Sequence, residues 1–352
     1  MKKIITNFIP SSGFHCITNS LKQIFNYNGK NFSEEMLFGL ASGLNFFYFD
    51  FKFSPIPMIG GRIKILDFEE NLAQRLKMKI IPNETTSNKR AYTELKKLIE
   101  NDIPVMIYTD MCYLSYLNMP EDYHFGGHSI VVFGIDEDDG VAYVSDRDGK
   151  DFKVTMNPDE IPQDFHIIPL EELAKARGSK AKPYPPKNRW FTYDFSEMKE
   201  LNRQMMCDCI TINIESMINT PIKNLGLEGI KLFSEKVKEW SDFEDDLLKN
   251  ASINAFVMIN EVGGNGGGCF RKMYGRFLIE ASKILGDPFL VRAGEEYEKI
   301  GNEWDVIGNH FYKVFETKDR KILNKISDKV FMLYIKETEL MDRLKEVVCK
   351  IF

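Results

Sequence analysis

The sequence predicts an α+β protein in which a mixed first half, up to about residue 180, precedes a helical second half. Two changes along the chain carry this prediction. Short apolar runs typical of strands lie between residues 104 and 146. The basic, proline-rich segment 177–189 has no periodicity and indicates a break. Beyond it, apolar residues recur at the spacing of helices that face a core.

Four segments of the first half are predicted as helices. Residues 16–27 carry apolar side chains at helical spacing. Residues 33–41 begin with Ser33, a residue type that caps helix N-termini. Residues 67–80 and 92–102 are the other two helical segments.

Four further segments are predicted as strands. The first is the aromatic-rich segment 45–53, and the others are 104–110, 128–136 and 141–146. The sequence EDDG at 137–140 is typical of a turn. We therefore expect the last two strands to form a hairpin.

Helical spacing dominates the second half. Residues 269–285 and 326–348 both place apolar side chains on one face, in the pattern of core-facing helices. We therefore predict two domains, residues 1–180 with mixed structure and residues 188–352 as an all-α domain.

Composition limits the classes of function. The 352 residues are 43% hydrophobic with a net charge of −6, which does not favour generic nucleic-acid binding. No charge-poor apolar run reaches the roughly 18 residues of a membrane span. The start MKKIITNFIPSSG lacks the long apolar region of a signal peptide. Six cysteines in a chain of this length suggest neither a disulfide scaffold nor a zinc ribbon. We expect no nucleic-acid or membrane partner, no metal and a cytoplasmic location.

The stretch SSGFHCITNSLKQIFNY, residues 11–27, places Cys16 at the predicted start of a helix. The unpaired N–H groups and the dipole of a helix N-terminus stabilise a thiolate there. Gly13 leaves room for the backbone to approach a carbonyl, and a backbone N–H near Cys16 can help to hold an oxyanion. A buried, unreactive thiol is the alternative interpretation.

A cysteine nucleophile needs a base with an orienting partner, and the predicted hairpin offers both. His128 begins one strand, and Asp146 and Asp148 follow the other. A five-residue turn places Asp148 directly across from His128 and Asp146 one diagonal step away on the same face. A four-residue turn reverses the parity and places neither aspartate well. The hairpin therefore permits a Cys–His–Asp set without requiring it.

This order of motifs resembles the papain-type cysteine-protease superfamily. Four segments together resemble the N-terminal domain of the butirosin biosynthesis protein H family: GFHCITNSLKQIFNYNGKNFSEEMLFGLASGLNFFY, PVMIYTDMCYLSY, HFGGHSIVVFGID and YVSDRDG. The segment GGNGGGCFRKMYGRFLIEA is similar to the helical domain that usually follows. The resemblance covers most of the chain and implies a papain-like first domain and an all-α second domain.

The resemblance also implies acyl transfer in the biosynthesis of a specialised metabolite such as an antibiotic. The family's namesake moves an aminoacyl group from the phosphopantetheine thioester of an acyl carrier protein to an amine of an aminoglycoside. Carried over to this sequence, Cys16 is the nucleophile, His128 the base and Asp146 the orienting residue, with Asp148 as the alternative. Phosphopantetheine arrives on the donor carrier protein, so the chain needs no cofactor of its own.

Further residues are candidates for substrate contacts. The glycine-rich segment 263–268 includes Gly266 and Gly267 before a predicted helix, an arrangement that can hold phosphate. We expect it either to line the donor entrance, with Arg271 assisting at the pantetheine phosphate, or to be a flexible connector. It has neither the P-loop nor the Rossmann pattern.

Aromatic residues and one carboxylate follow the strand at 104–110. Tyr113 can form part of a pocket wall and Asp110 can attract a cationic amine, with ordinary packing as the alternative. His124 is expected to have a structural or substrate-facing role. A zinc site with His15 and Cys16 is disfavoured, because HFGGH contains two glycines and precedes a strand.

One departure from the papain-type pattern bears on the reaction. Those proteases carry a glutamine before the cysteine as an oxyanion donor, whereas TNFIPSSGFHC has none, and Asn7, Ser11 or Ser12 would have to serve. Losing such a donor costs roughly 2.7–4 kcal/mol, which an activated thioester tolerates better than a peptide bond. A transferase is therefore favoured over a cysteine peptidase or amidase. A non-enzymatic binding module is the third alternative.

Overall fold

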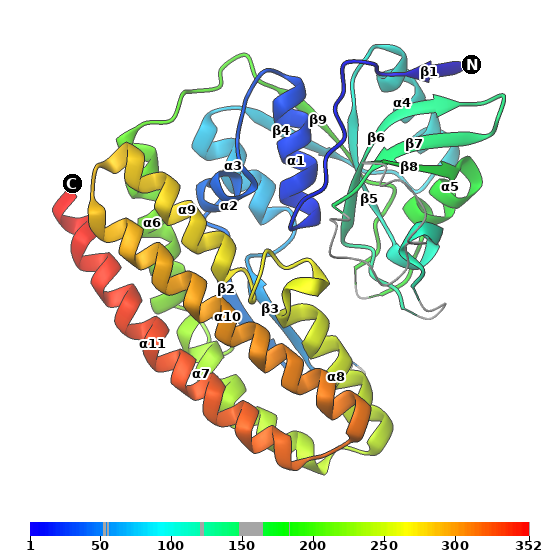
Figure 1. The fold of residues 1–352 in the computed structure, drawn as a ribbon. Helices are drawn as coiled ribbons and strands as arrows, with labels where there is room; N and C mark the ends of the chain where they lie inside the picture. Colours follow the sequence, from blue (N-terminus) through cyan, green and yellow to red (C-terminus); the bar gives the residue numbers. More distant parts are fainter. Residues whose placement is uncertain (52–53, 55, 120–122, 148–164, 183, 352) are drawn as a thin grey trace, which may run out of the picture. The chain divides into compact units, whose positions relative to one another are not determined.

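The computed structural model describes the chain except for residues 52–53, 55, 120–122, 148–164, 183 and 352 (Figure 1). The chain divides into two compact units. Unit 1 comprises Met1–Leu37 and Lys77–Met198, and unit 2 comprises Phe38–Leu76 and Lys199–Phe352. The predicted α+β class is confirmed. These boundaries differ from 1–180 and 188–352, because residues 38–76 belong with the C-terminal helices.

Unit 1 is built on an antiparallel sheet. Its strands are β1 (Lys2–Ile4), β4 (Lys79–Asn83), β5 (Val105–Thr109), β6 (His128–Asp136), β7 (Val141–Ser145), β8 (His166–Pro169) and β9 (Trp190–Asp194). They lie in the order β4-β9-β5-β6-β7-β8, and β1 also pairs with β6. Each residue of β6 is buried, as expected for a central strand with partners on both edges. This strand carries His128 at its first position.

The helices of unit 1 include α1 (Cys16–Tyr27), α4 (Asn88–Glu100), α5 (Leu170–Gly178) and the short 3-10 helices η1 (Met111–Tyr113) and η2 (Ser115–Leu117). Helix α1 packs against β5 and β6. Its apolar residues Ile17, Leu21 and Ile24 are buried at the predicted spacing. The start of α1 and the start of β6 thus belong to one packed unit.

Four strands of this sheet were not predicted, namely β1, β4, β8 and β9. Residues 79–80 were assigned to a helix, but they begin β4, whose Pro82 is tolerated because β4 lies at the sheet edge. Strand β9 lies in the region expected to be helical and pairs with β4 and β5. Strand β8 follows the undescribed residues 148–164 and pairs with β7.

The pairing of β6 with β7 differs from both of the registers that were considered for this hairpin. Its turn spans four residues, since Asp136 pairs with Val141. A bulge at Phe133 adds one residue to β6 and reverses the parity again. Beyond this bulge, Asp146 falls on the face of the hairpin that carries His128. The expectation that a four-residue turn would separate the two was wrong.

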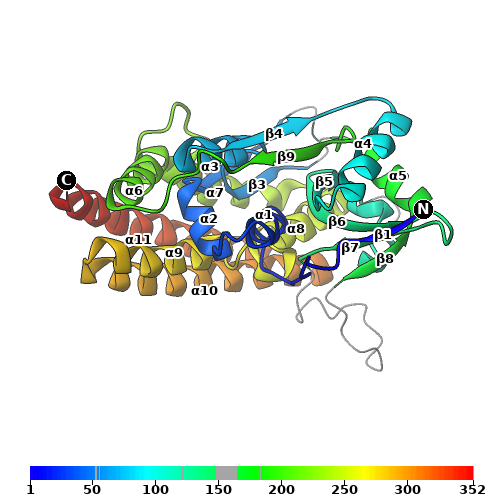
Figure 2. The same ribbon diagram turned by 90° about the horizontal axis from the view of Figure 1, so that it is seen from above.

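Unit 2 combines helices with a short hairpin. Its elements are β2 (Leu44–Phe49), β3 (Met58–Arg62), α3 (Asp67–Leu76), α6 (Arg203–Ile218), α7 (Gly226–Lys236), η3 (Val237–Asp242), α8 (Asp245–Ile259), η4 (Glu261–Gly263), α9 (Arg271–Leu285), α10 (Pro288–Thr317) and α11 (Lys321–Ile351), and α2 (Glu34–Leu40) crosses from unit 1. Helices α9, α10 and α11 lie side by side (Figures 1 and 2). The strands β2 and β3 pair within this unit, so it is not all-α, but they lie outside residues 188–352, the range predicted to be helical.

The predicted helix 269–285 begins two residues later than expected. Cys269 and Phe270 have φ values of 54° and 69°, in the left-handed region that a right-handed helix excludes. Helix α9 therefore starts at Arg271. Within the described residues, no helix is long and apolar enough to cross a membrane.

Candidate active site

The position of Cys16 is set by the start of α1. Cys16 is the first helical residue, and His15 is the N-cap, with φ −143° and ψ 136°. The Thr18 amide, which lacks an intrahelical acceptor, donates to Nδ1 of His15 at 3.5 Å. Cys16 is only 7% exposed. Its thiol thus lies at the helix end where the dipole favours negative charge.

The structure brings Cys16, His128 and Asp146 together in unit 1. Nε2 of His128 donates to Oδ2 of Asp146 at 2.7 Å. The other ring nitrogen is left for the Cys16 thiol, with which the His128 side chain shares a hydrogen bond. His128 and Asp146 are 2% and 1% exposed. A buried thiol, an imidazole and a carboxylate in this order can support nucleophilic chemistry.

Electrostatics favour an ion pair between the sulfur and the ring. Burial opposes ionisation of Cys16, but the charges and hydrogen bonds of His15 and His128 hold its pKa well below the ordinary value. Burial also disfavours a charged His128, yet Asp146 and Cys16 raise its pKa to about 10. Asp146 likewise has a lowered pKa, because His128 outweighs its burial. At neutral pH these directions describe a thiolate, an imidazolium and a carboxylate.

Asp146 has two further partners. The hydroxyl of Tyr116, in η2, donates to Oδ2 at 2.8 Å, and the amide of Arg147 donates to Oδ1 at 2.6 Å. The ring of Tyr116 stacks on His166 of β8, with centroids 3.8 Å apart. Tyr116 therefore fixes the carboxylate that orients His128. Tyr116 was not among the predicted site residues, although it lies in segment 104–116, which carries part of the family resemblance.

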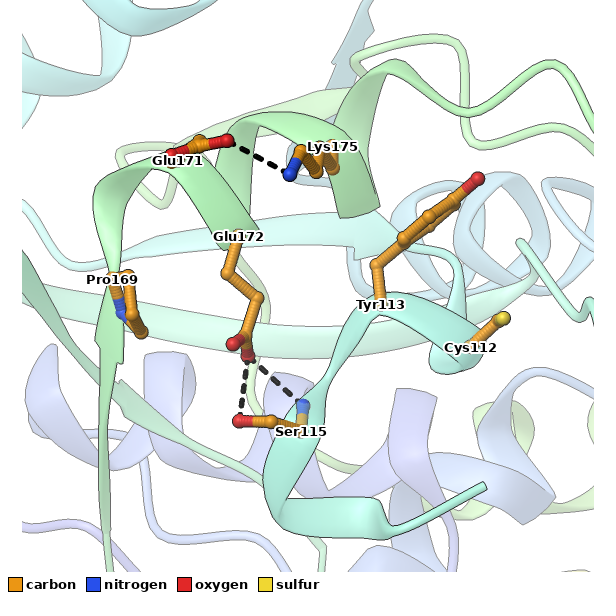
Figure 3. A pocket seen from close by; sticks show the side chains of 7 residues that line it. All are labelled: Cys112, Tyr113, Ser115, Pro169, Glu171, Glu172 and Lys175. Carbon is orange, nitrogen blue, oxygen red and sulfur yellow. Dashed lines mark hydrogen bonds and ion pairs between the residues drawn. The ribbon is translucent and has the colours of Figure 1, made fainter. Parts of the chain in front are cut away.

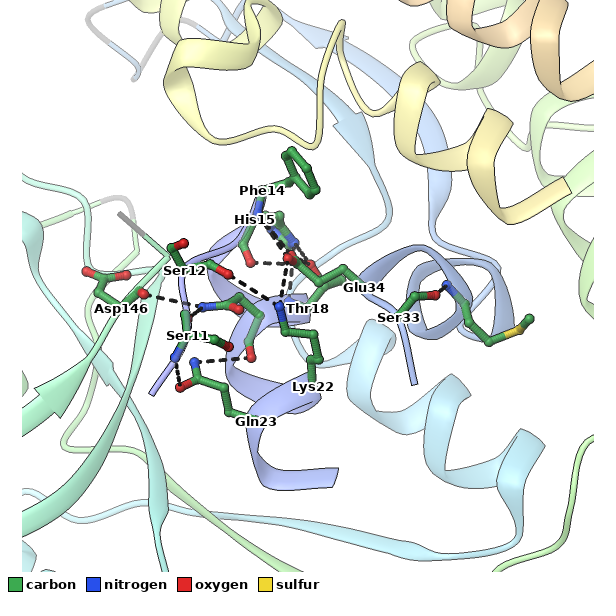
Figure 4. Close-up of polar contacts among 12 residues, drawn as sticks. Ser11, Ser12, Phe14, His15, Thr18, Lys22, Gln23, Ser33, Glu34 and Asp146 are labelled. Atoms are coloured by element: carbon green, nitrogen blue, oxygen red, sulfur yellow. Dashed lines mark hydrogen bonds and ion pairs between the residues drawn. The ribbon is translucent and has the colours of Figure 1, made fainter. Parts of the chain in front are cut away.

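Glu34 anchors the segment that precedes Cys16 (Figure 4). Its carboxylate accepts the amides of Phe14 and His15 at 3.0 and 3.1 Å and the hydroxyl of Thr18 at 2.8 Å. Lys22 lies 3.6 Å from the same carboxylate. Burial raises the pKa of Glu34 against these contacts. Glu34 is 3% exposed and was not among the predicted site residues.

Gly13 has a different local role from the predicted one. A Cβ at this position would overlap the carboxylate of Glu34 and the side chain of Asn19. Its amide donates to the carbonyl of Arg147 at 3.0 Å, and Nδ2 of Asn19 donates to the carbonyl of Asp146 at 3.3 Å. Gly13 thus allows the residues before α1 to lie against the loop that carries Asp146.

Asp110, His124 and Tyr113 form a second cluster. Oδ2 of Asp110 contacts Nδ1 of His124 at 2.8 Å and accepts the Ser179 hydroxyl at 2.6 Å. Oδ1 accepts the Phe125 amide at 3.0 Å. Asp110 is 0% exposed, so its contacts hold the loop, and they give no support to binding of a cationic amine.

Tyr113 packs against His124, with ring centroids 5.7 Å apart. It also lines an open pocket of about 400 Å³ (Figure 3). The other lining residues are Cys112, Ser115, Pro169, Glu171, Glu172 and Lys175. Tyr113, which was expected to form part of a pocket wall, thus lines a cavity in unit 1.

The glycine-rich segment lies in unit 2 and is buried there. Gly266 and Gly267 have φ values of 68° and 89°, which favour glycine, and a Cβ on Gly267 would lie 2.7 Å from the side chain of Lys272. Arg271 is 0% exposed and donates to both carboxylate oxygens of Glu337 at 2.9–3.2 Å. These are packing and ion-pair contacts inside the unit, and they give no support to a phosphate site.

Two other predictions concern Asp148 and a metal site. Asp148 lies outside the described residues. No group of three or more histidine, cysteine, aspartate or glutamate side chains suited to a metal ion occurs in the part of the chain that the structure describes.

Two family models match the chain. Residues 15–147 match "Butirosin biosynthesis protein H, N-terminal", a span that includes Cys16, His128 and Asp146. Residues 171–344 match "Domain of unknown function (DUF4872)". No curated protein matches the chain. The two matches follow one another in the domain order of the butirosin biosynthesis protein H family, and the chain belongs to this family.

Proposed function

We propose that the chain is a cysteine-dependent acyltransferase with a papain-like catalytic unit. In this proposal, it moves an acyl or aminoacyl group from a carrier-protein thioester to an amine in specialised-metabolite biosynthesis. The observation that carries the proposal is the hydrogen-bonded order of Cys16, His128 and Asp146 at a helix N-terminus. The match of this unit to a family named for butirosin biosynthesis supports the substrate class.

In the acylation half-reaction, the Cys16 thiolate attacks the thioester carbonyl. The tetrahedral adduct then breaks its bond to the phosphopantetheine sulfur, which leaves as a thiol after receiving a proton from His128. The product is an acyl-enzyme, with a neutral His128 still oriented by Asp146. A lowered thiol pKa makes the nucleophile available at neutral pH.

In the second half-reaction, the amine of the acceptor attacks the acyl carbon. Neutral His128 accepts a proton from the attacking amine, and the adduct breaks its bond to Cys16 to release an amide. The thiolate and the imidazolium are then restored. Each step uses groups of unit 1 together with the donor and the acceptor.

An oxyanion site is part of this mechanism. The amides of Cys16 and Ile17 occupy the first two positions of α1, where no intrahelical acceptor exists. We propose that the Cys16 amide faces the developing oxyanion. The amide of Ser11, which was expected as an oxyanion donor, already donates a hydrogen bond to Oε1 of Gln23 at 3.2 Å.

The direct test combines the purified protein with an acyl-loaded carrier protein and measures intact mass. We expect one acyl adduct on the wild type and on Cys112→Ala, a control at a partly exposed cysteine, and none on Cys16→Ala. An adduct that persists in Cys16→Ala would contradict the assignment.

A cysteine peptidase or amidase is the second candidate, because the same three side chains can serve hydrolysis. The acceptor separates the two functions. A hydrolase returns the free enzyme in plain buffer, whereas a transferase holds its acyl group until an amine is added. A binding module would instead show an ordinary thiol pKa near about 8.5 in the pH dependence of iodoacetamide labelling.

A further inference from the structure

Two imidazoles share the sulfur of Cys16. His15, the residue that immediately precedes the thiol, and His128, which belongs to β6, both lower the pKa of Cys16 through charge and side-chain hydrogen bonding. The mechanism above uses only His128. His15 is 3% exposed, so its ring is held inside the unit rather than in solvent. The role of this buried imidazole next to the Cys16 sulfur is therefore a separate question from the role of His128.

The orientation of His15 is fixed on its other side. Nδ1 lies 3.5 Å from the donating amide of Thr18 and 3.3 Å from its hydroxyl. The Thr18 hydroxyl donates to Oε2 of Glu34 at 2.8 Å, and the amide of His15 donates to the same oxygen at 3.1 Å. Glu34 thus holds both the backbone of His15 and the residue that aligns its ring.

These contacts determine which nitrogen can serve the sulfur. In the neutral ring, Nδ1 accepts from Thr18 and the hydrogen is on Nε2; in the charged ring, both nitrogens carry hydrogen, so Nε2 is a donor in either form. Nε2 is then the nitrogen left for Cys16 and can only donate. His128, by contrast, has to gain and lose a proton during the proposed reaction. His15 can therefore keep a hydrogen bond on the sulfur in both protonation states of His128.

We propose that His15 is a positioning residue that stabilises the Cys16 thiolate through its Nε2–H, while Thr18 and Glu34 hold the ring in place. The inference rests on the proposed function, since it assigns His15 to the resting nucleophile of that reaction. The charged and titratable groups around the thiolate are His15 and His128, with Asp146 behind His128 and Glu34 and Lys22 behind His15. The lowered pKa of the thiol is consistent with two donors.

The test distinguishes the effect of losing the His15 imidazole from the effect of losing the helix cap. Serine is a good N-cap residue but is too short to donate to the sulfur, so His15→Ser keeps the cap and removes the imidazole. His15→Ala removes both. The measurement is the pH dependence of iodoacetamide labelling of Cys16. In both variants, we expect the midpoint to rise by about one pH unit, which lowers labelling about tenfold at pH values below both midpoints. A wild-type profile in a folded His15→Ser would overturn the proposal.

A second measurement covers variants that fail to fold. In the wild type, the ring ¹⁵N resonance of His15 Nε2 is recorded before and after methyl methanethiosulfonate blocks Cys16. We expect a shift of the His15 Nε2 resonance as well as the His128 resonances, and an unmoved His15 resonance would overturn the proposal. An acyl adduct with an unchanged His15→Ser profile would reject this inference alone. A shifted profile without any adduct would reject the proposed function alone.

Discussion

Cys16 and Cys269 are two cysteines with similar positions relative to a helix and opposite chemical surroundings. Each lies at or near the start of a helix, and each is buried, at 7% and 0% exposure. The pKa of Cys16 is held well below its ordinary value, whereas burial raises that of Cys269 to about 12. A cysteine near a helix start is therefore not by itself a nucleophile.

The partners of the two cysteines account for the difference. Cys16 has two imidazoles within hydrogen-bond contact, and one of them is backed by Asp146. Cys269 has Arg271 nearby, but this guanidinium is bound to Glu337 and to the carbonyl of Cys269 itself. A cation whose charge is already matched by a carboxylate does little to stabilise a thiolate. The charge balance of the whole cluster decides the pKa.

The largest expected difference between the two cysteines is in alkylation. At pH 7 a thiol with a pKa of about 12 is ionised to only about one part in 10⁵, whereas the lowered pKa of Cys16 favours its thiolate. We expect iodoacetamide to label Cys16 at least about 10⁴-fold faster than Cys269 in the folded protein. Peptide mass mapping over time measures both rates. Comparable rates under native conditions would show that the surroundings do not govern reactivity.

The next largest effect is expected at the two histidines that pair with aspartates. His128 contacts Asp146 and Cys16, whereas His124 contacts Asp110 at a similar distance but is 31% exposed. We expect His128→Ala to lower acyl-transfer turnover by about 10²–10⁴-fold, the range for a positioned acid–base group. Any effect of His124→Ala should appear in KM. Steady-state kinetics measures both, and equal losses of turnover would contradict the assignment of His128.

The class of the fold and the candidates Cys16 and His128 were predictable, because they depend on patterns within short segments, whereas the choice of Asp146 over Asp148 came from the family resemblance. Helix 16–27, the strands of the β6–β7 hairpin and their order along the chain all follow local periodicity. The register was not predicted, because the bulge at Phe133 was missed, although the neighbouring Gly134 lies inside the strand and such a glycine often marks a bulge. Glu34 was also missed. It acts on His15 across a stretch of chain whose path depends on packing.

The boundary of the second unit was unpredictable for a related reason. Residues 38–76 precede strands of unit 1 in the sequence but pack with the C-terminal helices. Ser42, for example, donates its hydroxyl to the carbonyl of Cys209 in α6 at 3.0 Å. Such pairings depend on tertiary contacts and produce no periodic pattern in the sequence.

The contributions of His128 and Cys16 to folding stability depend on pH in opposite directions. His128 has a folded pKa of about 10, above its ordinary value of about 6.5, so its contribution is present below about 6.5 and lost as pH rises through 10. Cys16 has a lowered pKa, so its contribution is present above about 8.5 and lost as pH falls through the lowered value. Between about pH 6.5 and 8.5 the two slopes oppose each other.

Above about pH 8.5 only the His128 slope remains. We expect the stability contributed by the pair to fall by at most about 1.4 kcal/mol per pH unit up to pH 10. The measurement is the free energy of unfolding in urea for the wild type minus that of Cys16→Ala/His128→Gln. The raised pKa of Cys269 is present in both proteins and cancels. A difference that rises with pH in this range would contradict the ion pair.

A smaller loss of turnover is expected from a change at Tyr116, which contacts the Asp146 carboxylate. Tyr116→Phe keeps the ring on His166 but removes one hydrogen bond to the Asp146 carboxylate, and such bonds contribute about 1.5–3 kcal/mol. We expect a roughly tenfold loss of turnover and a lower pKa of His128. Tyr27→Phe is the matched control, because its hydroxyl donates to the backbone carbonyl of Asp102. A pH–rate profile identical to wild type would show that Tyr116 does not hold the carboxylate.

The smallest effect is expected around Cys269, where glycines serve packing. Gly267→Ala forces a non-glycine residue into the left-handed region and brings a Cβ to 2.7 Å from Lys272, which forms ion pairs with Asp305 and Glu261. We expect a loss of about 1–2 kcal/mol in the free energy of unfolding. Gly286→Ala, in the same unit, is the matched control, since it has φ 74° and nothing within 4 Å of its Cβ position. The excess loss in Gly267→Ala then reports the contact with Lys272. Neither variant should change labelling of Cys16 or the KM for the acyl donor. A raised KM at unchanged stability would instead support the donor entrance that the glycine-rich sequence suggested.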